Sequence, residues 1–210
     1  TQFGEEWVYN ISDSLNIDRS LTVLQFLDQE GGSIATLTNF ACHPTILDGA
    51  SSEVSADFAS SMYKYLDNTL GGVNFYLQGA IGGWIQPEYE SKTFESVDKR
   101  GRELGQAIET ALQNPTGLDS MAIHFKSEIF NMPVSNQNFR LLANMGVIDR
   151  TITDSVTTEL AWFSIGNAQF VTHPGETTPT HALLSKELMT MQGPKFVIGF
   201  GMDAMGYMLT

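Results

Sequence analysis

Three short segments each place a side chain that could do chemistry directly after an apolar run typical of a strand. The side chains are an imidazole, a carboxylate and a phenol, at His43, Glu176 and Tyr207. A proline or glycine lies next to each of them and indicates a turn toward solvent. Nitrogen and oxygen donors of these kinds are suitable zinc ligands. The three strand ends therefore predict a metal site.

The same segments, in the same order, resemble motifs of the neutral/alkaline ceramidase family. In that family the zinc ligands are the histidine of a W-F-A-x-H-P/G-T run, the glutamate of a P-G-E-x-T-T run and the tyrosine of an N-x-Y-x-x-Y-[VI]-T-T run. Carried over, the resemblance implies that His43, Glu176 and Tyr207 bind zinc and form the catalytic centre. Residues 9–12 and 17–26 also follow the family's N-x-S and V-D-x-x-[ML]-x-V-L-x-[FV] runs, so the similarity covers most of residues 9–207.

The sequence also departs from the family's pattern. The family's fourth ligand is a histidine in an H-x-H-S-G run, which we expect upstream of Thr1, and relatives continue past the final motif with T-x-E-E-Y. The sequence is therefore expected to be a portion of a longer protein. The family's G-D-x-S-P loop corresponds to residues 78–87, where Gly83 stands in place of the aspartate and no serine is present. The altered Gly82-Gly83-Trp84 loop puts ceramide specificity in question.

The resemblance implies a zinc-dependent amidohydrolase that cleaves the N-acyl amide bond of ceramide or a related N-acylated amphiphile. It also implies an α/β fold with mixed β-sheets flanked by helices, similar to the neutral ceramidase catalytic domain, and it favours a secreted or periplasmic protein. Two alternatives stay open. One is a degenerate homologue that binds a ligand without turnover, and the other is a metal hydrolase acting on a non-lipid amide or ester. Trp84, Tyr89 and Phe139 are candidates for lining the substrate pocket.

Each candidate ligand also has a structural interpretation. A histidine at a strand end is often only hydrogen-bonded, Glu176 could cap the helix expected after it, and Tyr207 could be a core residue. His173 and His181 lie near Glu176 in sequence, but the family has no histidine at either position, so we expect them to be supporting or structural.

Two further residues beside these motifs have competing interpretations. Cys42 adjoins His43, but neighbouring side chains on a strand face opposite ways, so we expect Cys42 in the core. Asp57 matches the family's S-S-D segment and equally suits the first turn of a helix.

Composition limits the partners. The formal charge is −13 and the pI is near 4.5, which argues against a nucleic-acid partner because such binding depends on Lys and Arg. No apolar run approaches the roughly 18 residues of a membrane span. A neutral small-molecule or lipid substrate is compatible with this charge, whereas the oligomeric state is left open.

Strand-like and helix-like patterns alternate along the 210 residues, as in one α/β domain spanning residues 1–210. Strands are expected at residues 21–27, 34–41, 73–77, 121–132, 157–165, 169–172 and 195–200. Helices are expected at residues 54–66, 94–112 and 178–191, and an irregular loop from about 133 to 154. The glycines at 31–32 and the Gly166-Asn167 pair predict hairpin turns.

Overall fold

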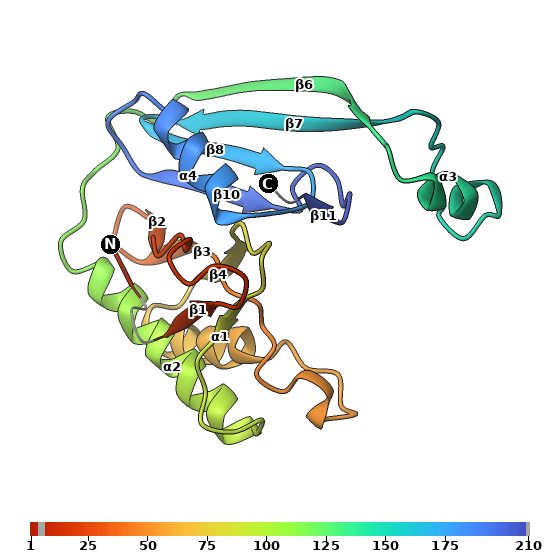
Figure 1. The fold of residues 1–210 in the computed structure, drawn as a ribbon. Coiled ribbons are helices and arrows are strands. Elements are labelled where there is room, and N and C mark those ends of the chain that lie inside the picture. The colour runs from red at the N-terminus through yellow and green to blue at the C-terminus, as the bar shows by residue number, and fades with distance from the viewer. Residues whose placement is uncertain (4–6, 209–210) are drawn as a thin grey trace.

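The computed structural model describes residues 1–3 and 7–208, and its strands and helices form two main layers (Figure 1). The strands are β1 (Val8–Asn10), β2 (Thr22–Leu27), β3 (Ser33–Phe40), β4 (Val73–Gln78), β5 (Ile85–Pro87), β6 (Ile123–Pro133), β7 (Ser155–Ile165), β8 (Ala168–His173), β9 (Glu176–Thr177), β10 (Lys195–Gly199) and β11 (Tyr207–Met208). The helices are the 3-10 turn η1 (Asp48–Ala50), α1 (Phe58–Thr69), α2 (Phe94–Ala111), α3 (Gln137–Asn144) and α4 (Pro179–Leu188). The predicted α/β class with mixed sheets is confirmed.

The first layer is a sheet in the order β2-β3-β4 that packs with α1 and α2. β2 and β3 are antiparallel around the predicted glycine turn, and β3 and β4 are parallel because α1 connects them. Helix α1 buries its apolar stripe, Phe58, Met62 and Leu66, against α2 and the strand residue Phe40. These contacts form the larger of the hydrophobic cores.

Helix α1 begins later than the sequence predicted. Val54 was expected on its apolar stripe but lies outside the helix and is fully exposed. The helix starts at Phe58 because the buried carboxylate of Asp57 accepts hydrogen bonds from the N–H of Phe58 at 2.8 Å and that of Leu47 at 2.9 Å. Asp57 is thus a cap that also fixes the segment after His43, and it lies just before the first turn of the helix in which it was expected.

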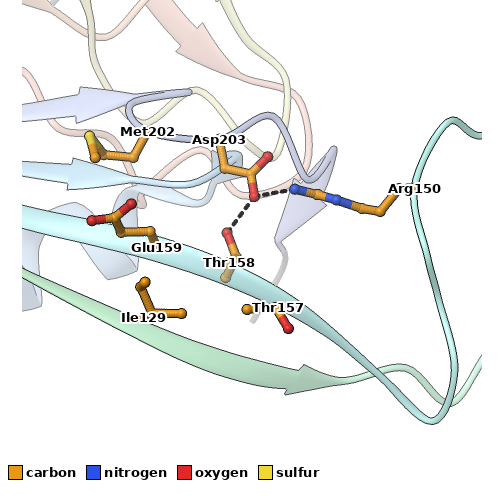
Figure 2. Close-up of a pocket in the computed structure, with 7 residues that line it drawn as sticks. All are labelled: Ile129, Arg150, Thr157, Thr158, Glu159, Met202 and Asp203. Carbon is orange, nitrogen blue, oxygen red and sulfur yellow. Dashed lines mark hydrogen bonds and ion pairs between the residues drawn. The ribbon is translucent and has the colours of Figure 1, made fainter.

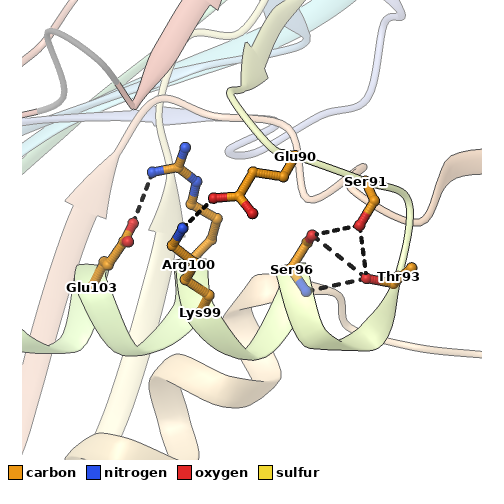
Figure 3. A network of polar contacts seen from close by, with 7 residues as sticks. All are labelled: Glu90, Ser91, Thr93, Ser96, Lys99, Arg100 and Glu103. Carbon is orange, nitrogen blue, oxygen red and sulfur yellow. Dashed lines mark hydrogen bonds and ion pairs between the residues drawn. The ribbon is translucent and has the colours of Figure 1, made fainter.

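Helix α2 is capped and carries charges along its exposed side (Figure 3). Thr93 accepts a hydrogen bond from the N–H of Ser96 at 3.4 Å, while Lys99 contacts Glu90 and Arg100 contacts Glu103. The Lys99–Glu90 pair is exposed, whereas the Arg100–Glu103 pair is half-buried, and an exposed ion pair contributes little to stability. Neither α2 nor any other helix in residues 1–3 and 7–208 is long and apolar enough to cross a membrane.

The second layer is a sheet in the order β10-β8-β7-β6, with α4 connecting the parallel strands β8 and β10. Phe163, Phe170 and Phe196 come from three neighbouring strands and stack with ring centroids 4.5 and 4.3 Å apart. They pack against Leu24, on β2, and form a second core between the two sheets. The two layers are therefore joined by aromatic and aliphatic contacts.

A buried amide also joins the two sheets. The side chain of Asn39, on β3, donates to the carbonyl of Val197 on β10 at 2.9 Å and accepts from the Val197 N–H at 3.0 Å. It also donates to Leu77 O at 2.9 Å. Nearby, a Cβ at Gly199 would lie 2.5 Å from the Gly79 carbonyl oxygen, so the backbones meet there without side chains. These contacts fix the ends of β3 and β10 relative to each other.

The segment between β6 and β7 differs from the sequence-based expectation. β6 and β7 pair over eleven residues each and extend away from the cores as a long antiparallel pair (Figure 1). The sequence predicted an irregular loop between them, but the structure has helix α3 there. Asn136 caps α3 by accepting from the N–H of Asn138 at 3.0 Å. The helix has only eight residues, none of them buried, which explains why its pattern was weak.

We predict that Asn39→Ala lowers the free energy of unfolding by about 2–4 kcal/mol, because the buried N–H and C=O of Val197 would both lose their partner. Urea denaturation measures this loss. The control is Asn68→Ala, whose exposed side chain donates only to its own helix and should change stability by less than about 0.5 kcal/mol. Equal effects of the two substitutions would contradict the proposed bridging role.

Candidate metal and catalytic site

His43 lies just beyond the end of β3, and both its backbone and its ring are anchored to one carbonyl group. Ile85 O accepts from the His43 N–H at 2.9 Å and from the ring Nδ1 at 2.6 Å. A carbonyl oxygen can only accept a hydrogen bond, so Nδ1 carries a proton. The ring is therefore oriented so that Nε2 is available to bind another group. Metal-binding histidines are commonly oriented in this way, by a hydrogen bond from the other ring nitrogen.

Glu176 begins β9, after the turn that follows β8. Its N–H donates to Gly206 O at 2.8 Å, and the next residue, Thr177, accepts from the Gly82 N–H at 2.8 Å. The carboxylate oxygen Oε1 lies 3.3 Å from His43 Nε2, with only 12% and 16% of the two side chains exposed. Glu176 lies before the helix rather than capping it, because Thr178 holds the position before α4. The cap interpretation of Glu176 is therefore wrong.

The pair formed by His43 and Glu176 has two chemical interpretations. With Nδ1 as donor, a neutral ring would present a lone pair to the carboxylate, and two acceptors would face each other. A proton shared between the two atoms, or a cation bound by both, would make this contact favourable. Ligand atoms of tetrahedral zinc lie about 3.3–3.4 Å apart when metal–ligand distances are near 2.05 Å. The observed 3.3 Å separation thus fits one edge of such a site.

Tyr207 lies beside Glu176 through strand pairing. β11 and β9 are parallel, with Tyr207 paired directly to Glu176. Directly paired residues project to the same face of a sheet. Tyr207 is 62% exposed, so the expectation of a buried core tyrosine does not hold. Tyr207 also lines the pocket that opens next to the pair.

The donors on the described residues do not by themselves complete a metal site. Over residues 1–3 and 7–208, no group of three or more His, Cys, Asp and Glu side chains converges as a metal-binding cluster. His43 and Glu176 supply two donors, and Tyr207 stands next to Glu176. The imidazole and the carboxylate are of the kinds that bind zinc, so they fit part of a zinc site.

The loop from Gly82 to Trp84 supports both members of the pair. A Cβ at Gly82 would lie 2.7 Å from the carbonyl carbon of Thr177 and 2.9 Å from Glu176 O. The backbone of β9 therefore packs directly against the backbone of Gly82. Gly83 and Trp84 both have positive φ, at 90° and 67°. This conformation is costly for tryptophan and is often found at functional sites. The Trp84 ring lies nearly parallel to the His43 ring, with centroids 6.3 Å apart.

A pocket of about 330 Å³ opens beside the pair. Its lining is Asn10, Ser12, Asp13, Asn16, Gly82, Gly83, Trp84, Thr178, Pro179 and Tyr207. Trp84, which was expected to line the substrate pocket, lines this pocket. Tyr89 instead packs against the larger core, and Phe139 lies on α3. Neither residue lines this pocket, because loop context does not reveal where a loop packs.

Two supporting residues were missed in the sequence. Gly82 is one, since only its packing against β9 shows why a side chain is excluded. Asn10 is the other, because its Oδ1 accepts from the N–H groups of Ser12 and Asp13 at 2.9 and 3.1 Å and shapes the pocket wall. The N-x-S run at residues 10–12 was the available signal for Asn10.

A second, open pocket of about 270 Å³ lies under the segment that leads to Tyr207 (Figure 2). Asp203 Oδ2 accepts from Arg150 Nη2 at 2.5 Å and from Thr158 Oγ1 at 2.6 Å. Burial, the largest single influence, would raise the pKa of Asp203, but the bonds from Arg150, Thr158 and the Ala204 N–H together lower it. Asp203 thus stays ionised and ties the segment before Tyr207 to β7.

His173 and Cys42, two neighbours of the candidate ligands, have structural roles. His173 is buried, with Nδ1 2.7 Å from Thr177 Oγ1 and Nε2 2.9 Å from Ser185 Oγ. Burial, with a smaller effect of His181, lowers the pKa of His173 to about 4, so the ring is neutral. Cys42 is fully buried, as predicted, and burial raises the pKa of its thiol.

Two solved structures share this arrangement of elements. A neutral ceramidase from Pseudomonas aeruginosa superimposes with a TM-score of 0.74 at 14% identity, over 100% of this chain and 45% of that one. A ceramidase complexed with C2 gives a TM-score of 0.74 at 12% identity, over 100% and 47%. The chain has the neutral ceramidase fold. It spans less than half the length of either ceramidase.

At these identities the likeness to the two ceramidases is one of fold. No protein-family model and no curated protein sequence matches the chain significantly. The resemblance inferred from short motifs is therefore supported by three-dimensional shape rather than by overall sequence similarity.

We predict that Gly82→Ala destabilises the protein by about 1–3 kcal/mol and displaces Glu176, because the new methyl group would overlap the β9 backbone. Urea denaturation measures the first effect, and the NMR signals of the His43 ring report the second. Gly49→Ala is the matched control, since a Cβ there has nothing within 4 Å. Unchanged His43 signals in Gly82→Ala would contradict the prediction.

The buried neutral ring of His173 predicts a pH dependence of stability. Its pKa is about 4 in the folded state and near 6.5 in the unfolded chain, so between these values the unfolded state binds more protons. Stability should therefore fall by up to about 3 kcal/mol as pH drops from 6.5 toward 4, with no further contribution below. Urea denaturation across this range should show the loss in the wild type and a shallower slope in His173→Gln.

The exposed His124 provides the control for this pH dependence, and His124→Gln should keep the wild-type slope. Identical slopes for His173→Gln and the wild type would show that His173 does not titrate in this way.

Proposed function

We propose that the chain carries part of the active site of a zinc-dependent amidohydrolase that cleaves the N-acyl amide bond of ceramide or a related N-acylated amphiphile. The observation that carries the proposal is the 3.3 Å approach of His43 Nε2 to Glu176 Oε1, two donors from distant segments on a ceramidase-like fold. Tyr207, paired with Glu176, is proposed as a third ligand. A fourth ligand would complete a tetrahedral set.

The residues of this chain would act mainly by holding donors in place. The Ile85 carbonyl fixes the tautomer of His43, so that Nε2 offers its lone pair. Backbone bonds to Gly206 and Gly82 hold β9, so that Glu176 is positioned without a long, flexible loop. Zinc bound there would polarise the scissile carbonyl and make a water molecule more acidic.

The substrate class rests on the fold and on the adjacent pocket. Both similar structures are ceramidases, which supports an amide of a fatty acid as substrate. The exposed face of Trp84, which is 51% exposed, offers an apolar surface beside His43 for an acyl chain. Glycine in place of the family's aspartate at position 83 leaves the polar contacts to the substrate different from those of relatives.

A second candidate is a metal hydrolase acting on a non-lipid amide or ester. The observation that favours it is the polar wall of the pocket, where Asn10, Ser12, Asp13 and Asn16 lie together. A substrate with hydroxyl or amine groups would suit that wall. Comparing hydrolysis of ceramide with that of short N-acyl amides and esters separates the two candidates.

The decisive experiment measures zinc content and fatty-acid release in the wild type, His43→Ala and Glu176→Ala. We expect both variants to bind zinc at least about tenfold more weakly and to lose activity. We expect Glu176→Ala to leave the fold nearly unchanged, because the residue begins the two-residue strand β9 and belongs to none of the hydrophobic cores.

Glu187→Ala, an exposed carboxylate on α4, is the control and should retain both zinc and activity. Equal zinc content in all the variants would remove His43 and Glu176 from the metal site. Bound zinc without hydrolysis of any amide or ester would instead identify a binding protein without turnover.

A further inference from the structure

Strand β6 forms a free edge of the second sheet. It pairs with β7 on one side, and within residues 1–3 and 7–208 its backbone forms no hydrogen bonds on the other side. Figure 1 shows this edge along the outside of the described part of the chain, with none of its helices or loops over it. A long, uncovered edge is a template for pairing with another strand.

The hydrogen-bond pattern shows which residues of β6 face outward. Gly166 N donates to Ala122 O and Val134 N donates to Asp154 O, and both bonds continue the register of the β6–β7 pair. Even-numbered residues therefore direct their N–H and C=O groups toward β7, because these directions alternate along a strand. The odd-numbered residues from 123 to 133 present their backbone groups to the free edge.

Three exposed apolar side chains lie on one face of this edge, which they share with Ser127 and Asn131. Ile123, Phe125 and Ile129 share that face and are 71%, 64% and 66% exposed. Phe125 pairs directly with Phe163, so it lies next to the buried stack of three phenylalanines. Exposed apolar residues grouped on a strand edge indicate an interface.

Two opposite charges lie at the middle of the edge. Lys126 and Glu128 flank Ser127, and neither forms an ion pair with any of the residues that the structure describes. A sequence with one cation and one anion placed symmetrically about a central residue is complementary to itself when the strand direction is reversed. An antiparallel copy of the same strand would therefore satisfy both charges.

We propose that β6 pairs antiparallel with β6 of a second copy, with the two-fold axis at Ser127. In this register Lys126 lies opposite the partner's Glu128 and Phe125 lies opposite the partner's Ile129, each twice. The odd-numbered residues form the hydrogen-bonded pairs, as their outward backbone groups require. Lys126 and Glu128 then occupy the closer, non-hydrogen-bonded pairs, where side-chain interactions are strongest. The two four-stranded sheets become one continuous sheet.

Charge selects this register over its neighbours. The outward backbone groups allow only shifts of two residues. The shift in one direction would place Lys126 opposite its own copy, and the shift in the other would place Glu128 opposite its own copy. Like charges directly opposite each other destabilise a strand pair. Pro133, which has no N–H, ends the ladder at an outward-facing position.

Charge reversal combined with analytical ultracentrifugation tests the proposal. Wild-type protein should show a concentration-dependent dimer at or below about 100 µM, which is within the range of modest interfaces. Lys126→Glu and Glu128→Lys should each weaken the dimer at least about tenfold, because each places like charges opposite each other twice. The double variant Lys126→Glu/Glu128→Lys restores opposite charges in the same register and should dimerise within about threefold of the wild type.

A cysteine at the symmetry axis gives an independent test. Paired Cα atoms in the proposed register lie about 5.5 Å apart, which a disulfide can span, so Ser127→Cys should cross-link to its own copy under oxidation. The native Cys42 is fully buried, and exposed Ser52→Cys serves as the control. A monomeric wild type, a dimer unaffected by the single charge reversals, or cross-linking of Ser127→Cys no faster than that of the control would overturn the proposal.

Discussion

The amide of Asn39 sets the relation between the two sheets, and the site depends on that relation. His43 follows β3 directly, whereas Glu176 follows β8, which is parallel to β10. Asn39 hydrogen-bonds both backbone groups of Val197 on β10, so the ends of these strands are held at one edge. Together with the phenylalanine and leucine contacts between the sheets, this link brings the imidazole and the carboxylate from two layers to one place. Their 3.3 Å approach is a consequence of how the layers meet.

Elements with long or strongly periodic patterns could be predicted from the sequence. The hairpin of β2 and β3, helix α2 and the turn at Gly166 were all found near their expected positions, because local propensity and burial agree there. The positions of His43 and Glu176 at strand ends were likewise predictable, since apolar runs followed by proline or glycine mark such ends. The prediction that the two side chains approach each other came from the motif resemblance and not from the hydrophobic pattern.

The remaining features depend on tertiary contacts that no local pattern encodes. Asp57 starts α1 late because its carboxylate also binds the N–H of Leu47, ten residues earlier. Gly82 is excluded from carrying a side chain only by the distant backbone of β9. Tyr89 and Phe139 lie in loop-like sequence contexts similar to that of Trp84, yet one packs in the core and the other lies on α3. Chain topology decides these outcomes.

The strained backbone at Trp84 also has a spectroscopic consequence. Trp84 has a left-handed backbone conformation, and its carbonyl oxygen accepts a hydrogen bond from the Ile11 N–H at 3.4 Å. Its half-exposed indole lies alongside the imidazole of His43. Of the other tryptophans, Trp7 is deeply buried and Trp162 lies on β7, away from this loop. The indole of Trp84 is thus an intrinsic fluorophore beside the ring of His43. A cation that bound the imidazole would change its emission, so binding could be followed without an added label.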